Sequence, residues 1–349
     1  MVENMDVRIE RAGAMGRVRL NRPKAINALT PEMIQKIEAA LTEFEADPDI
    51  GLVLITGEGE RGLCAGGDIR ALYDCGKEDL SFGEAFFRAE YRLNAHIAAF
   101  TKPYIAVMDG ITMGGGVGVS AHGSVRIVTE RTRMAMPETG IGFFPDVGAT
   151  WLLSHGPGEI GSFIGLTGDS FGGADAIYAG LADVLVESQR LETLIDALAA
   201  LPANVTRDDV RALVNGFAKA APAPLAAHRA EIDHCFAFDE VEAIIAALQA
   251  QGSDFAAQTL QVMARKSPTS MKVSLRLLRA ARQDANLRES LAREFGVTFR
   301  VLASDEFYEG VRAAVVDKDR NPKWSPANLA EVSPALVASY FPPALRPLF

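Results

Sequence analysis

Short apolar runs alternate with longer segments of helical spacing in the first half of the chain. Residues 7–20 show two alternating strand patterns separated by Gly13 to Gly16, which predicts a β-hairpin. A helix is predicted from Pro31, because Thr30 supplies an N-cap hydroxyl and apolar positions then recur every three or four residues. Further apolar runs predict buried strands at 51–57, 104–110 and 125–130.

The second half of the chain has helical spacing almost throughout. Helices are predicted there over 189–200, 207–219, 238–251, 253–265, 268–283 and 286–303. A shorter helix near 115–122 is predicted between two of the strands. Because strands separated by helices favour a parallel sheet, the fold class is predicted to be α/β. We expect an α/β core over residues 1–185, with a helical C-terminal region over 186–349 that packs on it.

Composition narrows the classes of function. The 349 residues carry a net charge of −10, which argues against general nucleic-acid binding. Three widely spaced cysteines predict a reducing compartment and neither a disulfide framework nor a zinc site. No apolar run is long enough to span a bilayer, and the N-terminus lacks the pattern of a signal peptide. We therefore expect a cytoplasmic protein with no nucleic-acid or membrane partner.

Two glycine-rich segments, 63–74 and 109–123, each precede a predicted helix. The N–H groups at a helix N-terminus have no partner within the helix, and the helix dipole is positive there. If each segment aims one N–H at the same oxygen, the two together form an oxyanion hole. A tight junction without chemistry also explains the glycines, because glycine permits close backbone approach. The residues alone leave both interpretations open.

A dinucleotide site is a rival interpretation of the second glycine segment. Gly116, Gly118 and Ala121 match the G-x-G-x-x-A fingerprint, and Glu138 follows about twenty residues later. The fingerprint places its acid at the end of the second strand, whereas Glu138 comes after Pro137, beyond that strand. The motif also lies unusually far from the N-terminus for that fold. An NAD-linked dehydrogenase therefore stays as an alternative function.

Two acids stand in an apolar and irregular segment, 136–148. Glu138 and Asp146 are surrounded there by glycine, proline, phenylalanine and methionine, and no lysine, arginine or histidine lies between them. Burial raises the pKa of a carboxyl group and suits it to acid–base work or nucleophilic attack. The alternative is structural: Glu138 caps a backbone turn, and Asp146 caps a helix that begins near Val147.

Seven segments together carry a family resemblance. Four of them are NRPKAINALT (21–30), CAGGDI (64–69), DGITMGGGVG (109–118) and MPETGIGFFPDVG (136–148). They resemble the crotonase (enoyl-CoA hydratase/isomerase) superfamily. Within it the chain looks most like the subgroup that hydrolyses 3-hydroxyisobutyryl-CoA. That narrower match lies in FFRAEYRLN (86–94), SPTSMKVSLR (267–276) and EFYEGVRAAVVDKDRNPKW (306–324).

The resemblance implies a crotonase-type ββα spiral core with a helical C-terminal region. It also implies hydrolysis of 3-hydroxyisobutyryl-CoA to 3-hydroxyisobutyrate and CoA, as in valine breakdown. The thioester carbonyl is expected between the N–H groups of Gly67 and Gly115. No metal and no redox cofactor are implied, because CoA enters as part of the acyl-CoA substrate. An enoyl-CoA hydratase or isomerase on the same scaffold is the alternative, and a non-enzymatic acyl-CoA-binding protein is a further one. The formation of a homo-oligomer is left open.

The resemblance also assigns the acids. Glu138 occupies the position of a catalytic glutamate of the superfamily. The second glutamate of the hydratases falls at the position of Gly118, which carries no acid and so counts against hydration. Asp146 and Glu90 belong instead to the pattern of the hydrolases. We expect Asp146 to act with Glu138 in catalysis, and Glu90 to bind the 3-hydroxyl group of a substrate that Gly115, Glu138 and Asp146 also contact.

Overall fold

The computed structural model describes residues 6–76, 80–342 and 347–349. The chain divides into two compact units, each assembled from separate stretches of sequence. We call the first the sheet unit; it comprises Met1–Gly67, Arg92–Met134 and Phe171–Pro224. We call the second the helical unit; it comprises Asp68–Tyr91, Ala135–Ser170 and Leu225–Phe349.

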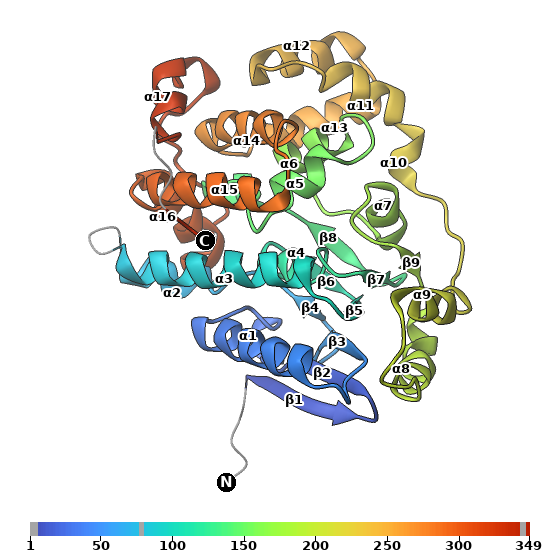
Figure 1. The fold of residues 1–349 in the computed structure, drawn as a ribbon. Coiled ribbons are helices and arrows are strands. Elements are labelled where there is room, and N and C mark those ends of the chain that lie inside the picture. The colour runs from blue at the N-terminus through green and yellow to red at the C-terminus, as the bar shows by residue number, and fades with distance from the viewer. Residues whose placement is uncertain (1–5, 77–79, 343–346) are drawn as a thin grey trace. The chain divides into compact units, whose positions relative to one another are not determined.

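Among the described residues, a six-stranded sheet forms the centre of the sheet unit (Figure 1). In spatial order its strands are β1 (Val7–Ala12), β2 (Met15–Leu20), β3 (Leu52–Gly57), β5 (Tyr104–Met108), β7 (Val125–Val128) and β9 (Val184–Leu185). β1 and β2 pair antiparallel, and every later pair in this order is parallel. The predicted hairpin, the three predicted buried strands and the α/β class are confirmed.

Helices bury the faces of this sheet. Helix α1 (Pro31–Ala46) begins where predicted: the Thr30 hydroxyl accepts the Met33 N–H at 3.3 Å, and Pro31 occupies the first helical position. Helices α8 (Leu191–Ala199) and α9 (Arg207–Asn215) contribute leucine and valine side chains to a core shared with the central strands. The sheet unit also contains η1 (Pro23–Ala25), α7 (Gly173–Tyr178) and η3 (Ser188–Arg190).

A second, smaller sheet carries the glycine-rich segments. Its strands are β4 (Gly62–Cys64), β6 (Ile111–Met113) and β8 (Arg133–Ala135), each three residues long. Helix α4 (Gly115–Gly118) begins two residues after β6. It is shorter than the predicted helix over 115–122, and the chain then continues in turns. Three successive glycines lose much conformational freedom in a helix, which limits its length.

The helical unit contains the first part of α3 (Ser81–Ala99), the turn η2 (Glu138–Ile141) and helices from both halves of the chain (Figure 1). Its other elements are α2 (Ile69–Cys75), α5 (Ala149–Ser154), α6 (Ile160–Thr167), α10 (Pro224–Ala227), α11 (Arg229–Cys235), α12 (Val241–Gln251), α13 (Asp254–Met263), α14 (Pro268–Ala281), α15 (Leu287–Leu302), α16 (Asp305–Val311), the π-turn Arg312–Val316, η5 (Leu329–Glu331) and α17 (Pro334–Ser339). The six helices predicted from residue 189 onward are all present, in both units.

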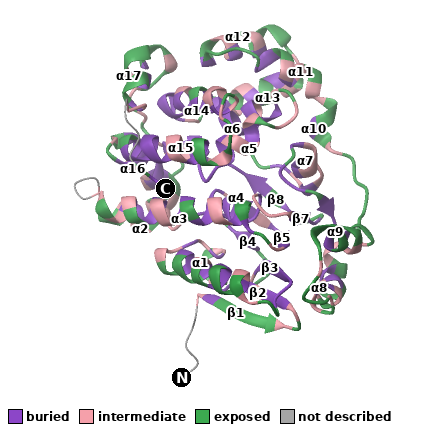
Figure 2. Cartoon of the chain, in the orientation of Figure 1, coloured by how far each residue is buried: buried purple, intermediate pink, exposed green. Residues whose placement is uncertain are grey.

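Aromatic side chains form the interior of the helical unit. Phe143 stacks on Phe144 and on Phe87, with ring centroids 4.6 and 5.5 Å apart. The ring of Tyr91 meets Phe87 and Phe295 edge to face. Figure 2 shows buried stretches along α14 and α15, whose apolar faces complete this interior. The acids of the predicted site are therefore placed in surroundings that exclude water.

Candidate active site

The segment 136–148 is folded into the interior of the helical unit. Glu138 begins the turn η2, and Asp146 lies in the loop that leads to α5. A Cβ atom on Gly310 would lie 2.3 Å from the carbonyl carbon of Ile141, so helix α16 packs directly on this turn. Burial beneath a helix explains why so apolar a segment flanks the two acids.

The three carboxylates predicted for the site are all buried in the helical unit. The exposed fractions of Glu90, Glu138 and Asp146 are 2%, 6% and 5%. Glu90 is supplied by α3, Glu138 by η2, and Asp146 by the loop before α5. The charge of Asp146 raises the pKa of both glutamates. The structure thus brings these three predicted site residues together.

Burial dominates the titration of these acids, because removal from water disfavours the charged form of a carboxyl group. It raises the pKa of Glu90 and of Glu138 well above the usual range. It also raises the pKa of Asp146 to about 7, against hydrogen bonds from the Tyr91 hydroxyl and the backbone that lower it. A group with a pKa near neutrality both takes up and releases a proton readily, as acid–base catalysis requires.

A buried tyrosine holds Asp146. The Tyr91 hydroxyl donates to Oδ2 of Asp146 at 2.7 Å, and its oxygen lies 3.1 Å from Oγ1 of Thr298. The next residue, Val147, has a φ of +55°, which is rare for a β-branched side chain. Strained backbone of this kind persists only where surrounding contacts hold it, and it is typical of functional sites.

A fourth buried acid, Glu294, holds the backbone that follows Asp146. Its carboxylate accepts the N–H groups of Gly148 at 2.8 Å and Thr150 at 3.2 Å, together with the Thr150 hydroxyl. The N-cap residue of α5 is Gly148, with no side-chain cap from the preceding residues. The capping alternative for Asp146 is therefore wrong, because Glu294 from a distant helix provides that cap.

Glu138 and Glu90 differ from Glu294 in one respect. Among the described residues, neither Oε2 of Glu138 nor Oε1 of Glu90 has a hydrogen-bond partner. Buried polar atoms are normally paired, so an unpaired one is suited to bind substrate or water. The ammonium group of Lys266 lowers the pKa of Glu138. It lies close to η2, because a Cβ atom on Gly140 would be 3.7 Å from its Nζ.

The two glycine-rich segments meet in the sheet unit. β4 and β6 are parallel neighbours, and a Cβ atom on Gly66 would lie 3.8 Å from the backbone nitrogen of Gly115. Gly115 is the first residue of α4, where N–H groups have no partner within the helix. Gly67 forms a parallel bridge with Leu29. Any side chain on Gly116 would clash, because its Cβ atom would lie 2.4 Å from the Cys64 carbonyl oxygen.

The arrangement does not match a dinucleotide fingerprint. Gly116 and Gly118 lie in a helix of four residues, too short for the helix that binds a pyrophosphate at its N-terminus. The strand after this helix, β7, ends at Val128, whereas Glu138 lies in η2 of the helical unit. Gly118 is buried in α4, so no carboxylate is present at the position where the hydratases carry their second glutamate.

The sequence did not single out Tyr91, Thr298, Glu294 or Lys266. A signal for Glu294 exists in the predicted helix 286–303, because this charged residue falls on the buried stripe of that helix. Thr298 lies one turn further on the same stripe. The position of Lys266 beside η2 has no comparable signal, because it depends on how distant segments pack.

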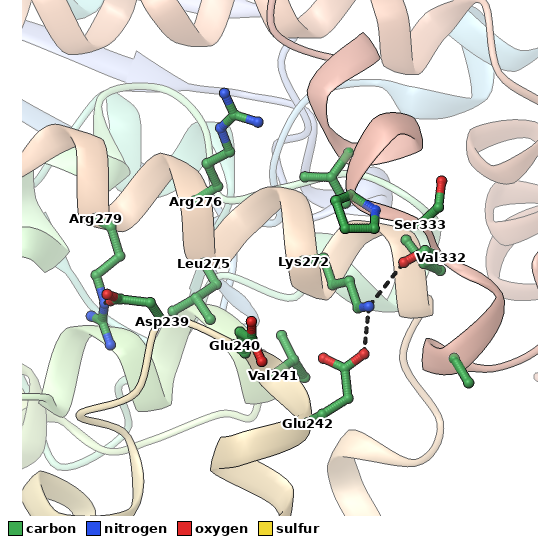
Figure 3. A pocket seen from close by; sticks show the side chains of 13 residues that line it. Asp239, Glu240, Val241, Glu242, Lys272, Leu275, Arg276, Arg279, Val332 and Ser333 are labelled. Carbon is green, nitrogen blue, oxygen red and sulfur yellow. Dashed lines mark hydrogen bonds and ion pairs between the residues drawn. The ribbon is translucent and has the colours of Figure 1, made fainter.

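A separate pocket of 620 Å³ lies elsewhere in the helical unit (Figure 3). It is lined by the beginning of α12, one side of α14 and the segment 330–337, and it contains none of the three acids. The ammonium group of Lys272 in this pocket forms an ion pair with the Glu242 carboxylate at 2.5 Å and donates a hydrogen bond to the Val332 carbonyl oxygen at 2.9 Å. We assign no part of the predicted chemistry to this pocket.

Comparison with known proteins decides the family. A model of the enoyl-CoA hydratase/isomerase family matches residues 15–341. The chain belongs to this family. It is 42% identical to 3-hydroxyisobutyryl-CoA hydrolase, mitochondrial, from Rattus norvegicus, over 97% of this chain and 89% of that protein. It is 40% identical to the protein of the same name from Homo sapiens, over 96% of this chain and 88% of that protein.

Solved members of the family share the fold. One is a carnitinyl-CoA dehydratase from Mycobacterium thermoresistibile, 46% identical, with a TM-score of 0.92 and 98% of this chain and 97% of that chain covered. Another is an enoyl-CoA hydratase from Rhodobacter sphaeroides 2.4.1, 42% identical, with a TM-score of 0.89 and 97% of this chain and 98% of that chain covered. The predicted crotonase-type architecture is confirmed.

No helix among the described residues is both long and apolar enough to cross a membrane. No group of three or more histidine, cysteine, aspartate and glutamate side chains is placed to hold a metal ion in that part of the chain.

Proposed function

We propose that this member of the enoyl-CoA hydratase/isomerase family hydrolyses the thioester of 3-hydroxyisobutyryl-CoA, as a step of valine breakdown. The products are 3-hydroxyisobutyrate and CoA. The observation that carries the proposal is the trio of buried carboxylates, Glu90, Glu138 and Asp146, combined with glycine at position 118. Relatives that are 40–43% identical over nearly the whole chain bear the name of this hydrolase, which supports the same choice.

The proposed roles follow from the chemistry of acyl transfer. The N–H groups of Gly67 and Gly115 stabilise the oxyanion that forms when the carbonyl carbon is attacked. Glu138 either takes a proton from the attacking water or attacks the carbonyl carbon itself. The C–S bond then breaks, and the departing thiolate of CoA accepts the proton that Glu138 took from water. If Glu138 attacks instead, expulsion of the thiolate leaves a mixed anhydride; a water molecule then hydrolyses it to 3-hydroxyisobutyrate and free Glu138, and a proton of that water passes to the thiolate. Asp146 acts with Glu138 in these proton transfers, because burial sets its pKa at about 7.

Glu90 is proposed to bind the 3-hydroxyl group of the acyl chain. Its buried carboxyl group has one unpaired oxygen, Oε1, among the described residues. Burial raises the pKa of Glu90 well above its usual range, which favours the protonated form of its carboxyl group, and that form has an O–H to donate to the substrate hydroxyl. A site built around a substrate hydroxyl strongly rejects an acyl chain that lacks it, because the protein group then stays unpaired.

Hydration of an enoyl-CoA is the second candidate, because two solved relatives bear the names of a dehydratase and a hydratase. The missing carboxylate at Gly118 disfavours it. The two activities separate in one experiment: release of free thiol from 3-hydroxyisobutyryl-CoA, and loss of the conjugated absorbance of crotonyl-CoA, are measured with the same enzyme. Thiol release with poor hydration supports the proposal. Efficient hydration without thiol release contradicts it.

The remaining expectations are also proposals. We propose that no cofactor is needed beyond the CoA of the substrate, and that the protein contacts neither nucleic acid nor a membrane. The relatives that carry the hydrolase name are named as mitochondrial, whereas the composition of this chain led us to expect the cytoplasm. Cell fractionation with a specific antibody decides between the compartments. Light scattering of the purified protein tests for a homo-oligomer.

A further inference from the structure

A chain of buried hydroxyl groups runs from Asp146 into helix α15. Oδ2 of Asp146 lies 2.7 Å from the Tyr91 hydroxyl, which lies 3.1 Å from Oγ1 of Thr298. Oγ1 of Thr298 lies in turn 2.9 Å from the carbonyl oxygen of Glu294. Tyr91 and Thr298 are both 0% exposed. The hydrogen bonds at these three contacts must therefore be made with the protons of Asp146, Tyr91 and Thr298 alone.

Counting the protons distinguishes two states of this row of hydrogen-bonded groups. Each hydroxyl donates one hydrogen bond, and an ionised carboxylate donates none. When Asp146 is ionised, Tyr91 donates to it, and Thr298 donates either to Tyr91 or to the Glu294 carbonyl. Two protons then serve three contacts. When Asp146 is protonated, it donates to Tyr91, Tyr91 donates to Thr298, and Thr298 donates to the carbonyl. Every contact then holds one proton.

We propose that Tyr91 is a positioning residue that keeps Asp146 in place in both protonation states, and that Thr298 stabilises the protonated state by accepting the Tyr91 hydroxyl. Neither Tyr91 nor Thr298 is proposed to touch the substrate. Between the two states Asp146 gains or loses one proton. The hydroxyl groups of Tyr91 and Thr298 only rotate, and each keeps its own proton. The catalytic meaning of this arrangement rests on the proposed hydrolysis, but the arrangement itself does not.

Other titratable groups face Asp146 from each element around it. Glu90 and Tyr91 lie on α3, Glu138 lies on η2 with the charge of Lys266 beside it, and Glu294 lies on α15. The carboxyl groups favour a protonated Asp146 when they are ionised, whereas the lysine favours an ionised one. These charges remain when a hydroxyl group is removed. Variants of Tyr91 and Thr298 therefore isolate the effect of the hydrogen bonds.

The proton count predicts opposite effects for the two hydroxyl groups. Tyr91→Phe removes the donor to ionised Asp146, so the pKa of Asp146 rises by about one to two units. Thr298→Val leaves that donor but removes the acceptor for Tyr91 in the protonated state, so the pKa falls by about half a unit to one unit. Thr298→Ser keeps a hydroxyl group and is expected to leave the pKa near its wild-type value.

The test is a pH titration by ¹³C NMR of protein labelled at the aspartate carboxyl carbons, with the Asp146 signal assigned from Asp146→Asn. Tyr340→Phe is the matched control, because it removes a buried tyrosine hydroxyl of the helical unit that interacts with Ser304. The proposal predicts shifts of opposite sign for Tyr91→Phe and Thr298→Val, and none for the control. Shifts of the same sign, or no shift for Thr298→Val, would overturn it.

Activity measurements separate this proposal from the proposed function. The proposal predicts that the pH of half-maximal kcat moves in the same direction as the NMR value, while KM stays near the wild-type value. If the wild-type enzyme releases no thiol, the proposed hydrolysis is wrong, but the NMR titration still tests the roles of Tyr91 and Thr298. If Tyr91→Phe does not fold, the downward shift of Thr298→Val, which retains Tyr91, still decides the matter.

Discussion

Replacing Asp146 by asparagine is expected to stabilise the protein at pH 8 while it impairs turnover. Burial raises the pKa of Asp146 from 3.8 to about 7, and each pH unit corresponds to 1.36 kcal/mol. The ionised side chain therefore costs about 4 kcal/mol of folding free energy. Asparagine keeps the shape and an oxygen that accepts the Tyr91 hydroxyl, but it removes this cost.

The sign of the pH dependence follows from proton binding. The folded state keeps the Asp146 proton at pH values where the unfolded state has lost it. The contribution of Asp146 to the unfolding free energy of the wild type therefore falls as the pH rises from about 4 to about 7. Asp146→Asn lacks this contribution. The difference in unfolding free energy between variant and wild type should grow over that range, toward about 4 kcal/mol at pH 8.

Urea unfolding at several pH values between 4 and 8 measures this difference. In a Trp324→Phe background, Trp151 of α5 is the sole tryptophan and reports on the loop that carries Asp146. Asp208→Asn is the matched control, because the side chain of Asp208 is 94% exposed. A stability difference for Asp146→Asn that stays constant from pH 4 to pH 8 would refute the burial of an acid with a raised pKa.

Three further predictions concern the same site. Glu138→Gln should lower kcat for thiol release by at least about a hundredfold with an unchanged circular dichroism spectrum, because it removes the base or nucleophile. Glu90→Ala should impair 3-hydroxyacyl-CoA substrates more than unhydroxylated ones, and equal losses in kcat/KM would indicate a structural role. Gly310→Ala should lower the melting temperature, because its Cβ atom would lie 2.3 Å from the Ile141 carbonyl carbon. Gly140→Ala, in the same turn as Ile141, is the control: its Cβ atom would have its nearest contact at an ordinary 3.7 Å, and the variant should melt like the wild type.

Much of the fold could be predicted because its main elements carry strong local patterns. Strands β3 and β5 consist almost entirely of apolar residues, as buried parallel strands do, and α1 has both a cap and regular spacing. Strands β4, β6 and β8 could not be predicted, because three residues are too few to show an alternation. The end of α4 was also missed, because glycine gives no apolar period to follow.

The site also has residues that could be predicted from the sequence and residues that could not. Glu138 and Asp146 could be predicted, because a charged side chain is unusual in an apolar, irregular segment. Their partners could not, because the contacts join distant positions: Tyr91 lies 55 residues from Asp146 and 207 residues from Thr298. No local pattern contains such a pairing. The effect of the Lys266 charge on Glu138 likewise arises only when the segment before α14 lies against η2, where the Ser267 N–H donates to the Thr139 carbonyl.

The buried acids of the helical unit can be divided by how they are satisfied. Glu294 accepts three hydrogen bonds from Gly148 and Thr150, which is what a carboxylate that supports a loop requires. Glu90 and Glu138 each leave one oxygen unpaired among the described residues. An apolar side chain in their place would avoid that cost. Stability alone therefore accounts for Glu294 but not for Glu90 and Glu138, and under the proposed function the substrate supplies their missing partners.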